Sequence, residues 1–287
     1  MSASNPPIVD APRAEGWLEG VGGKRLFWRS YVPDEPRAVV LLAHGASEHG
    51  DRYRYVVERL VPDGFAVYAV DHRGHGRSDG SRAMLDRMDH VVADFDRLAE
   101  HARAQHPGLR LFLLGHSMGG TVALAYALRH QAKLAGLALS APLAALEAAP
   151  LPLRVVARAL SVVAPTAGVY DVEAEGVSRD LDEVRAYDED PLVYRGKLPA
   201  RTVQEIADTI AGFHDAVPSL TLPTLVMHGT ADRIVPIAAA EMIALRSGAS
   251  DLTFHRYDGF YHEIFNEPAG ERDRPLGDLA AWLSDRA

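Results

Sequence analysis

The sequence has no cysteine among its 287 residues. This absence excludes disulfide bonds, thiolate metal sites and a cysteine nucleophile. It also has no cluster of Lys or Arg, and 39 acidic residues against 30 basic ones give a formal net charge of −9. A nucleic-acid-binding surface is therefore not expected, because such surfaces neutralise phosphates with basic side chains.

Long apolar runs are also missing. No segment has the ~20 uninterrupted apolar residues that a membrane-spanning helix needs. Residues 1–16 lack the apolar segment of a signal peptide, and we expect them to form a loose leader. These absences predict a cytoplasmic protein, and peripheral attachment to a membrane stays open beside it.

The sequence does contain short apolar runs that alternate with amphipathic segments. Residues 17–32 are typical of a hairpin that turns at Gly22-Gly23. The further apolar runs span 38–44, 65–70, 109–115, 134–140, 222–229 and 251–257. Helical spacing occurs at 52–61, 88–105, 118–130, 238–247 and 276–286. This alternation predicts an α/β fold, a mostly parallel sheet with helices on both faces.

The alternation stops between residues 143 and 220. We expect this segment to be a helical cap, or lid, inserted into a core made of residues 17–142 and 221–287. One helical face collects the apolar residues Val155, Val156, Ala159, Leu160 and Val163, with Arg154 and Arg158 opposite. Such a face is suited to a membrane or micelle surface, and packing against the protein itself is the equal alternative.

A serine lies between glycines where an apolar run meets a helical pattern. Gly115-His116-Ser117-Met118-Gly119 has the G-x-S-x-G form of a nucleophile elbow, in which the glycines remove side chains that would collide in the tight turn. We expect Ser117 to be a nucleophile and the Met118 amide to stabilise an oxyanion. A serine that only caps the helix is the alternative. We expect the His116 side chain to point away from the serine, into the structure.

A serine nucleophile needs a base and a group that orients the base. His262 follows the last predicted strand, and Asp232 follows the strand before it. The chain order Ser117, Asp232, His262 is the order found in α/β-hydrolases. Asp258 lies four residues before His262 and is the alternative acid.

A second oxyanion donor is expected after the strand at 38–44. There the chain continues with Gly45 and Ala46, and the Ala46 amide stands where this donor is needed. A plain turn at the end of the strand is the alternative.

Five motifs occur in one order, namely HGASEHGDRY, DHRGHGRSDG, GHSMGG, HGTADRIVP and YDGFYHEIFNE. With them the sequence resembles the monoacylglycerol lipase and lysophospholipase branch of the α/β-hydrolases, most closely the bacterial monoacylglycerol lipases. The likeness runs from about residue 17 to the end. It implies an α/β-hydrolase fold with an eight-stranded sheet and a cap, and no cofactor or metal. It also implies a catalytic triad of Ser117, His262 and Asp232, with Ala46 and Met118 as oxyanion donors.

The resemblance further implies a glycerol site made of Glu48, Arg52 and Tyr187, although the two charged residues have each other as alternative partners. The residues of DHRGHGRSDG are expected to serve as scaffold. The implied activity is hydrolysis of monoacylglycerol, a small lipid ester, through an acyl-enzyme on Ser117. A lysophospholipase, a general carboxylesterase and an aminopeptidase use the same machinery and remain alternatives. A ligand-binding protein that uses the fold without turnover is a more distant one.

Overall fold

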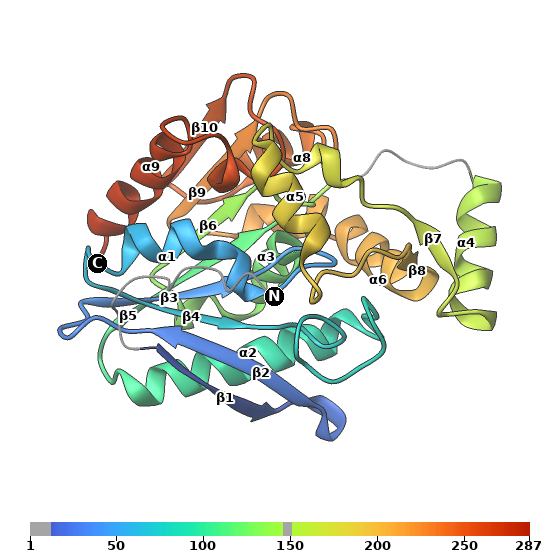
Figure 1. The fold of residues 1–287 in the computed structure, drawn as a ribbon, viewed down its shortest axis with the longest axis horizontal. Helices are drawn as coiled ribbons and strands as arrows, with labels where there is room; N and C mark the ends of the chain where they lie inside the picture. Colours follow the sequence, from blue (N-terminus) through green and yellow to red (C-terminus); the bar gives the residue numbers. More distant parts are fainter. Residues whose placement is uncertain (1–12, 146–150) are drawn as a thin grey trace.

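The computed structural model describes residues 13–145 and 151–287, with only the backbone described for residues 151–154. The part of the predicted leader at residues 1–12 lies outside these ranges. An eight-stranded sheet runs through the molecule in the order β1-β2-β4-β3-β5-β6-β9-β10 (Figure 1). Its strands are β1 (Arg13–Glu19), β2 (Arg25–Tyr31), β3 (Ala38–Ala43), β4 (Phe65–Val70), β5 (Arg110–His116), β6 (Gly136–Ser140), β9 (Thr224–Gly229) and β10 (Leu252–Tyr257).

The prediction of a mostly parallel sheet is confirmed. Only the pairs β1–β2 and β2–β4 are antiparallel, and the other neighbours run parallel. Every residue of β3, β4, β6 and β9 is buried, which explains why these strands are apolar throughout.

The expected start of the first strand was wrong by four residues. β1 begins at Arg13, which pairs with Tyr31, so residues 13–16 belong to the sheet and not to a loose leader. β1 has no buried residue, because it is an edge strand. Its first three residues, Arg13, Ala14 and Glu15, are all exposed, so the start of the strand has no apolar alternation in the sequence.

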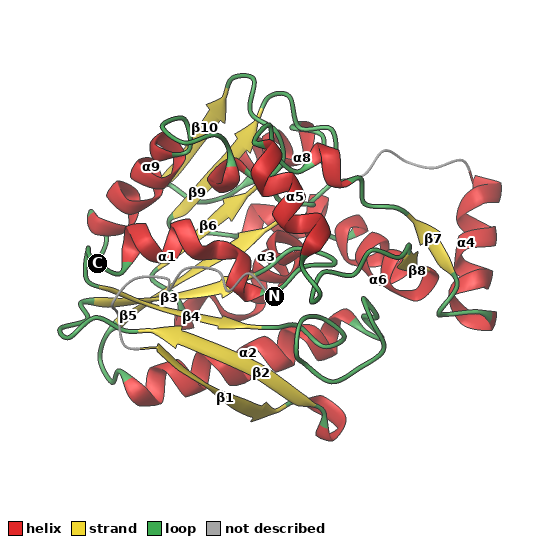
Figure 2. Ribbon diagram, viewed as in Figure 1, coloured by secondary structure: helices red, strands yellow, loops and turns green. Residues whose placement is uncertain are grey.

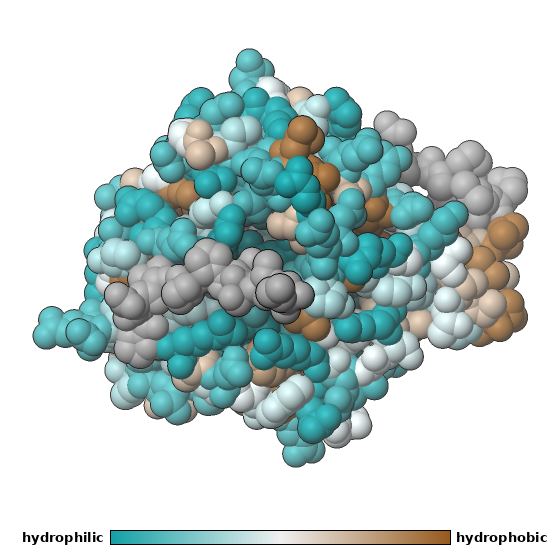
Figure 3. All heavy atoms as spheres, viewed as in Figure 1, coloured by the Kyte–Doolittle hydropathy of each residue, from teal (hydrophilic) through white to brown (hydrophobic). Residues whose placement is uncertain are grey.

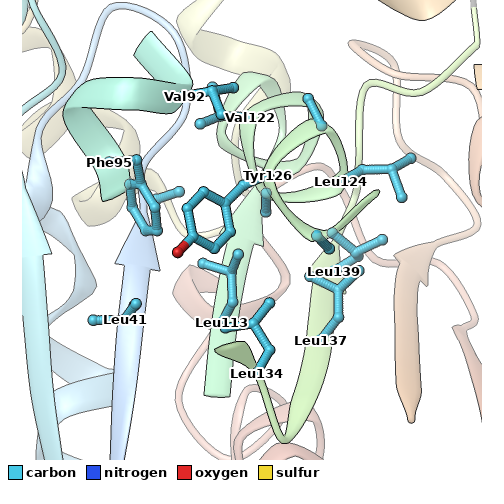
Figure 4. Packing of buried hydrophobic residues seen from close by; sticks show 14 of the residues in the cluster. Leu41, Val92, Phe95, Leu113, Val122, Leu124, Tyr126, Leu134, Leu137 and Leu139 are labelled. Carbon is cyan, nitrogen blue, oxygen red and sulfur yellow. The ribbon is translucent and has the colours of Figure 1, made fainter. Parts of the chain in front are cut away.

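Helices cover both faces of the sheet (Figure 2). α2 (Met88–Gln105) and α3 (Met118–His130) contribute to a core on one face, and α1 (Arg54–Leu60) and α9 (Asp273–Ser284) contribute to a core on the other. Figure 4 shows Phe95 of α2 and Tyr126 of α3 packed over the leucines of the central strands. α8 (Ala238–Arg246) also joins the first core.

Two predicted helix starts needed adjustment. The segment predicted from residue 52 opens as a tight 3-10 turn, Gly50–Tyr53, before α1 begins. The last helix starts at Asp273, three residues earlier than expected, because Pro275 lies in its first turn, where a proline breaks no helical hydrogen bond.

The predicted cap segment lies between β6 and β9 and contains short strands as well as helices. Its elements are α4 (Leu151–Val163), β7 (Gly168–Tyr170), α5 (Leu181–Glu189), β8 (Leu198–Pro199), α6 (Ala200–Ala211) and α7 (Phe213–Ala216). α6 is not separate from the core, since Ile206 and Ile210 pack into the same core as α2 and α3.

α4 projects at one side of the molecule (Figure 1), and an apolar surface lies over it in Figure 3. Val155, Val156, Val162 and Val163 have exposed fractions between 60% and 79%. Arg158 pairs with Asp208 of α6. The side chain of Arg154, predicted opposite the valines, lies outside the described part of the chain.

Candidate active site

Ser117 occupies a strained turn between β5 and α3. Its φ of 54° is positive, a conformation that residues other than glycine rarely adopt. Both flanking glycines are required by packing. A Cβ on Gly115 would lie 2.5 Å from the Gly119 carbonyl oxygen, and a Cβ on Gly119 would lie 2.5 Å from the His44 carbonyl oxygen. This is the geometry of a nucleophile elbow.

His262 and Asp232 are joined directly. His262 Nδ1 lies 2.7 Å from Asp232 Oδ2, and the amides of Ile234 and Val235 donate to Asp232 Oδ1 at 2.8 and 2.9 Å. Burial alone would raise the pKa of Asp232, but the charge of His262 and these hydrogen bonds, with one from His228, hold it well below its ordinary value. Asp232 is therefore an ionised group that fixes the imidazole.

Asp258, the alternative acid, has a different partner. Its Oδ1 accepts a hydrogen bond from Thr230 Oγ1 at 3.1 Å at an exposed position. The contact with His262 comes from Asp232, so the geometry favours Asp232 over Asp258.

Ser117 and His262 line one cavity, whose empty space is about 830 Å³ when the open solvent at its mouth is included. Over the described residues no hydrogen bond joins the Ser117 hydroxyl to the His262 ring. Such bonds are often long in enzymes without substrate and shorten when substrate binds.

Ala46 and Met118 line the same cavity. Within the described part of the chain neither amide donates a hydrogen bond, whereas the neighbouring Gly45 amide donates to Glu48 Oε1. Two unpaired amides beside a serine hydroxyl suit an oxyanion hole, which needs donors free to meet developing charge.

The loop that carries Ala46 is tied to the second half of the cap. The Ser47 carbonyl, at a residue with a φ of 67°, accepts the Tyr194 amide at 2.8 Å. His49 Nε2 lies 2.8 Å from Asp190 Oδ2. The loop is thus supported from outside the sheet.

His116 is buried as expected, but it does not leave the site. It lines the cavity, and its ring centre lies 4.7 Å from that of His262. The Cβ of a residue at Gly115 would face α3, so the alternation of the strand turns His116 to the opposite side, where His262 lies. Burial, with the charge of His262, lowers the pKa of His116 to about 3, so its ring is neutral.

Three more buried histidines lie close together near the loop that carries Ala46. The ring centre of His44 lies 4.3 Å from that of His72 and 5.4 Å from that of His75. Burial lowers the pKa of His72 to about 3 and that of His75 to about 4, and it takes the pKa of His44 well below its ordinary value. These three and His116 are called the neutral histidines below.

Glu48, Arg52 and Tyr187 come together in space, joined by Glu263, which the sequence analysis missed. Arg52 binds both oxygens of Glu263 at 2.5 and 2.9 Å and Glu48 Oε2 at 3.1 Å. Its guanidinium lies 4.5 Å from the centre of the Tyr187 ring. Glu48, Tyr187 and Glu263 line the cavity, but Arg52 is not part of the lining.

The two carboxylates differ electrostatically. Burial would raise the pKa of Glu263, but Arg52 lowers it to about 2. Burial and the charge of Glu263 raise the pKa of Glu48 against the opposing effect of Arg52. Glu263 was missed because its partner lies 211 residues away, and the only signal was an acidic residue directly after the predicted base.

The cavity is otherwise apolar. Its hydrophobic lining consists of Leu143, Val172, Val177, Leu198, Val203, Ile206, Ile234 and Val235, with Tyr170 beside them. One cavity therefore joins a hydrophobic part, the serine and a charged end.

The DHRGHGRSDG segment makes scaffold contacts, as expected. Asp71 binds the buried Arg29 through two hydrogen bonds of 2.9 and 3.1 Å and accepts the amides of Gly50 and Arg77. Among the described residues no group of three or more His, Asp or Glu side chains is arranged to hold a metal ion. None of the helices in the described ranges has the length and hydropathy to cross a bilayer.

The strand order, the serine elbow and the cap position are those of the α/β-hydrolase class. Comparison with known proteins agrees, since residues 34–269 match the family model of serine aminopeptidase, S33. The chain belongs to this family.

Its relatives include monoacylglycerol lipases. The monoacylglycerol lipase of Mycolicibacterium smegmatis is 40% identical, over 96% of this chain and 99% of that protein. The human monoglyceride lipase is 31% identical, over 98% of this chain and 92% of that protein. The crystal structure of Paleococcus ferrophilus monoacylglycerol lipase is 29% identical and matches with a TM-score of 0.82, over 91% of this chain and 99% of that one.

Proposed function

We propose that this protein hydrolyses the ester bond of monoacylglycerols to fatty acid and glycerol, through an acyl-enzyme on Ser117. The observation that carries the proposal is the joining, in one cavity, of the elbow serine, the His262–Asp232 pair and a long apolar lining. The monoacylglycerol lipases among its relatives support the same substrate class.

In the proposed mechanism the Ser117 oxygen attacks the ester carbonyl while His262 Nε2 takes the hydroxyl proton. Asp232 holds the tautomer and stabilises the imidazolium. The amides of Ala46 and Met118 bind the oxyanion of the tetrahedral intermediate. His262 then gives its proton to the departing glycerol oxygen. A water molecule, activated in the same way, cleaves the acyl-enzyme and frees the fatty acid.

In this proposal the two halves of the substrate bind to different parts of the lining. The acyl chain lies against the apolar side chains under the cap, and the glycerol hydroxyls face Glu48, Tyr187 and Glu263. Because Arg52 stands behind these side chains, its proposed role is to hold them in place.

Release of fatty acid from monoacylglycerol, diacylglycerol, triacylglycerol and lysophosphatidylcholine, measured side by side, tests the substrate class. Ser117→Ala serves as the blank, and we expect it to lose several orders of magnitude in turnover. A clear preference for monoacylglycerol supports the proposal. A preference for lysophosphatidylcholine, or activity on short synthetic esters alone, replaces it with a lysophospholipase or a general carboxylesterase. A folded wild type that neither turns over an ester nor reacts with an organophosphonate probe would favour a binding protein.

We also propose that α4 rests on a lipid surface while substrate enters. The exposed valines of α4 support this, because an unpaired apolar stripe on a projecting helix favours a membrane interface. Flotation with phospholipid vesicles tests it against a Val156→Asp, Val163→Asp double variant. If the wild type floats no better than the double variant, α4 does not bind lipid.

A further inference from the structure

The charged end of the cavity, formed by Glu48 and Glu263 with Arg52 behind them, carries a net negative charge. We propose that Glu48 and Glu263 act as a charge filter, which admits uncharged alcohol groups and excludes phosphate-bearing ones. The inference rests on the proposed function and extends it, because it selects neutral glycerol esters over phosphorylated glycerol esters.

The filter consists of two carboxylates that both reach the cavity. Glu48 is 3% exposed and Glu263 is 6% exposed, so both charges are shielded from bulk water. No Lys or Arg belongs to the lining over the described residues. A bound head group therefore meets carboxylate oxygens and no free cation.

Arg52 does not cancel this sign. Its guanidinium is already shared between Glu48 and Glu263, at 3.1 Å from the first and at 2.5 and 2.9 Å from the second. One positive charge against two negative ones leaves the cluster with a net negative charge. The Arg52 guanidinium also lies 4.5 Å from the centre of the Tyr187 ring, and Tyr187 lines the cavity while Arg52 does not.

The partners of Glu48 favour its carboxylate form, against the rise in its pKa that burial and Glu263 cause. It accepts hydrogen bonds from the Gly45 amide, the Tyr53 hydroxyl and Arg52, all of which are donors. A protonated carboxyl group would bring a proton of its own to this crowded set. Glu263 likewise accepts from Arg52 and from the Asn266 amide group at 2.7 Å.

The chemistry of the head group then decides which substrate binds. A glycerol hydroxyl donates a proton and can pair with a carboxylate oxygen. The phosphate of a phosphate monoester brings negative charge, so the two carboxylates repel it. We take about 5 Å between the net negative charge of the cluster and a singly charged phosphate, and an effective dielectric constant of about 20. Their repulsion then lowers kcat/KM for the phosphate ester by about 100-fold or more relative to the neutral ester.

The test compares two substrates that differ only in the phosphate, 1-oleoylglycerol and 1-oleoylglycerol 3-phosphate, in the same mixed detergent micelles. For the wild type we expect kcat/KM to favour the neutral ester by about 100-fold. In Glu263→Gln, which keeps the shape and removes one charge, the ratio falls about tenfold or more because hydrolysis of the phosphate ester rises. Asp258→Asn, a carboxylate change outside the cavity, keeps the wild-type ratio.

If Glu263→Gln only disturbs the structure of the site, the ratio of the two kcat/KM values stays unchanged. If Glu263→Gln lowers both substrates by the same factor, Glu263 only supports the fold of the site and the filter is refuted. Equal hydrolysis of both substrates by the wild type refutes it as well, while leaving the proposed monoacylglycerol activity intact. If the wild type cleaves p-nitrophenyl butyrate but neither oleoyl ester, the proposed function itself fails, and the filter with it.

A second measurement needs no variant. The non-hydrolysable ether 1-O-octylglycerol and its 3-phosphate are tested as inhibitors of p-nitrophenyl butyrate hydrolysis by the wild type, below their micellar concentrations. We expect the neutral ether to compete and the phosphate to compete about 100-fold more weakly. Competition of equal strength by the two ethers overturns the proposal even if Glu263→Gln does not fold.

Discussion

Gly119 offers a sharp test of the packing that positions the site. It lies in the first turn of α3, directly against the end of β3. A Cβ added there would lie 2.5 Å from both the carbonyl carbon of Ala43 and the carbonyl oxygen of His44. Both atoms are backbone, so no side-chain rotation relieves the contact. Carbon atoms pack best at about 3.5–4.0 Å, so Gly119→Ala must push β3 and α3 apart by about 1 Å.

Two opposing effects set how much Gly119→Ala lowers the free energy of unfolding. Alanine favours a helix over glycine by about 0.5–1 kcal/mol. Overpacking costs about 1–3 kcal/mol, and the rigid contact places Gly119→Ala at the upper end of that range. We therefore expect a net loss of about 2 kcal/mol in the free energy of unfolding. Because β3 leads into Gly45 and Ala46, a 1 Å shift also lowers kcat by about 100-fold.

Gly277 is the matched control. It also lies in a helix, α9, but a Cβ there meets no atom within 4 Å. Gly277→Ala should raise the free energy of unfolding by about 0.5–1 kcal/mol and leave kcat unchanged. Urea unfolding and p-nitrophenyl butyrate hydrolysis measure both quantities. If Gly119→Ala behaves like Gly277→Ala in both assays, the close packing of α3 on β3 does not determine the site.

Three further predictions concern charge. Asp232→Asn should lower kcat by about 10³–10⁴-fold by losing the tautomer of His262, and equal rates for it and its control Asp258→Asn would remove Asp232 from the mechanism. Asp71→Asn leaves the fully buried Arg29 with Asp51, 3.2 Å from its Nε, as its remaining carboxylate and should cost about 3 kcal/mol in urea unfolding, where a loss below 1 kcal/mol would show that Asp51 neutralises Arg29 alone. The pKa values of the four neutral histidines are lowered in the folded state, so the stability they contribute is complete above about pH 6.5 and is lost as the pH falls. The free energy of unfolding in urea should fall between pH 7.5 and pH 5, with a limiting slope of about 5 kcal/mol per pH unit, and a flat profile would mean that these rings are protonated in the folded protein.

The sheet was largely predictable because most of its strands are buried on both faces. A strand such as β3 or β4 must be apolar throughout, and that pattern is local in the sequence. The start of β1 was not predicted, because Arg13 and the two residues after it are exposed and carry no apolar pattern. In the cap, the helical face predicted at residues 154–163 falls on α4, whereas the elements β7, β8 and α7 are too short for a pattern to indicate them.

The candidate site was predictable where a residue is fixed by its place on a strand end. Ser117 and Asp232 follow buried strands and His262 follows the partly buried β10, so the topology brings them to one edge. Their catalytic roles stay predictions. The long-range partners were out of reach, because nothing near Arg52 in sequence indicates Glu263. The position of His116 depended on the direction of the last residue of β5, which a motif does not specify.

The ties from Ser47 to Tyr194 and from His49 to Asp190 bear on how such proteins can be recombined. A chimera that takes residues 143–220 from a relative would replace Asp190 and Tyr194 together with α4, the helix proposed to meet lipid. If the new cap has no acceptor in place of Asp190, the loop that carries Ala46 loses its contact through His49, and turnover would fall for a reason unrelated to substrate fit. Exchanging only the first half of the cap, up to β7, transfers α4 and leaves the contact between His49 and Asp190 in place.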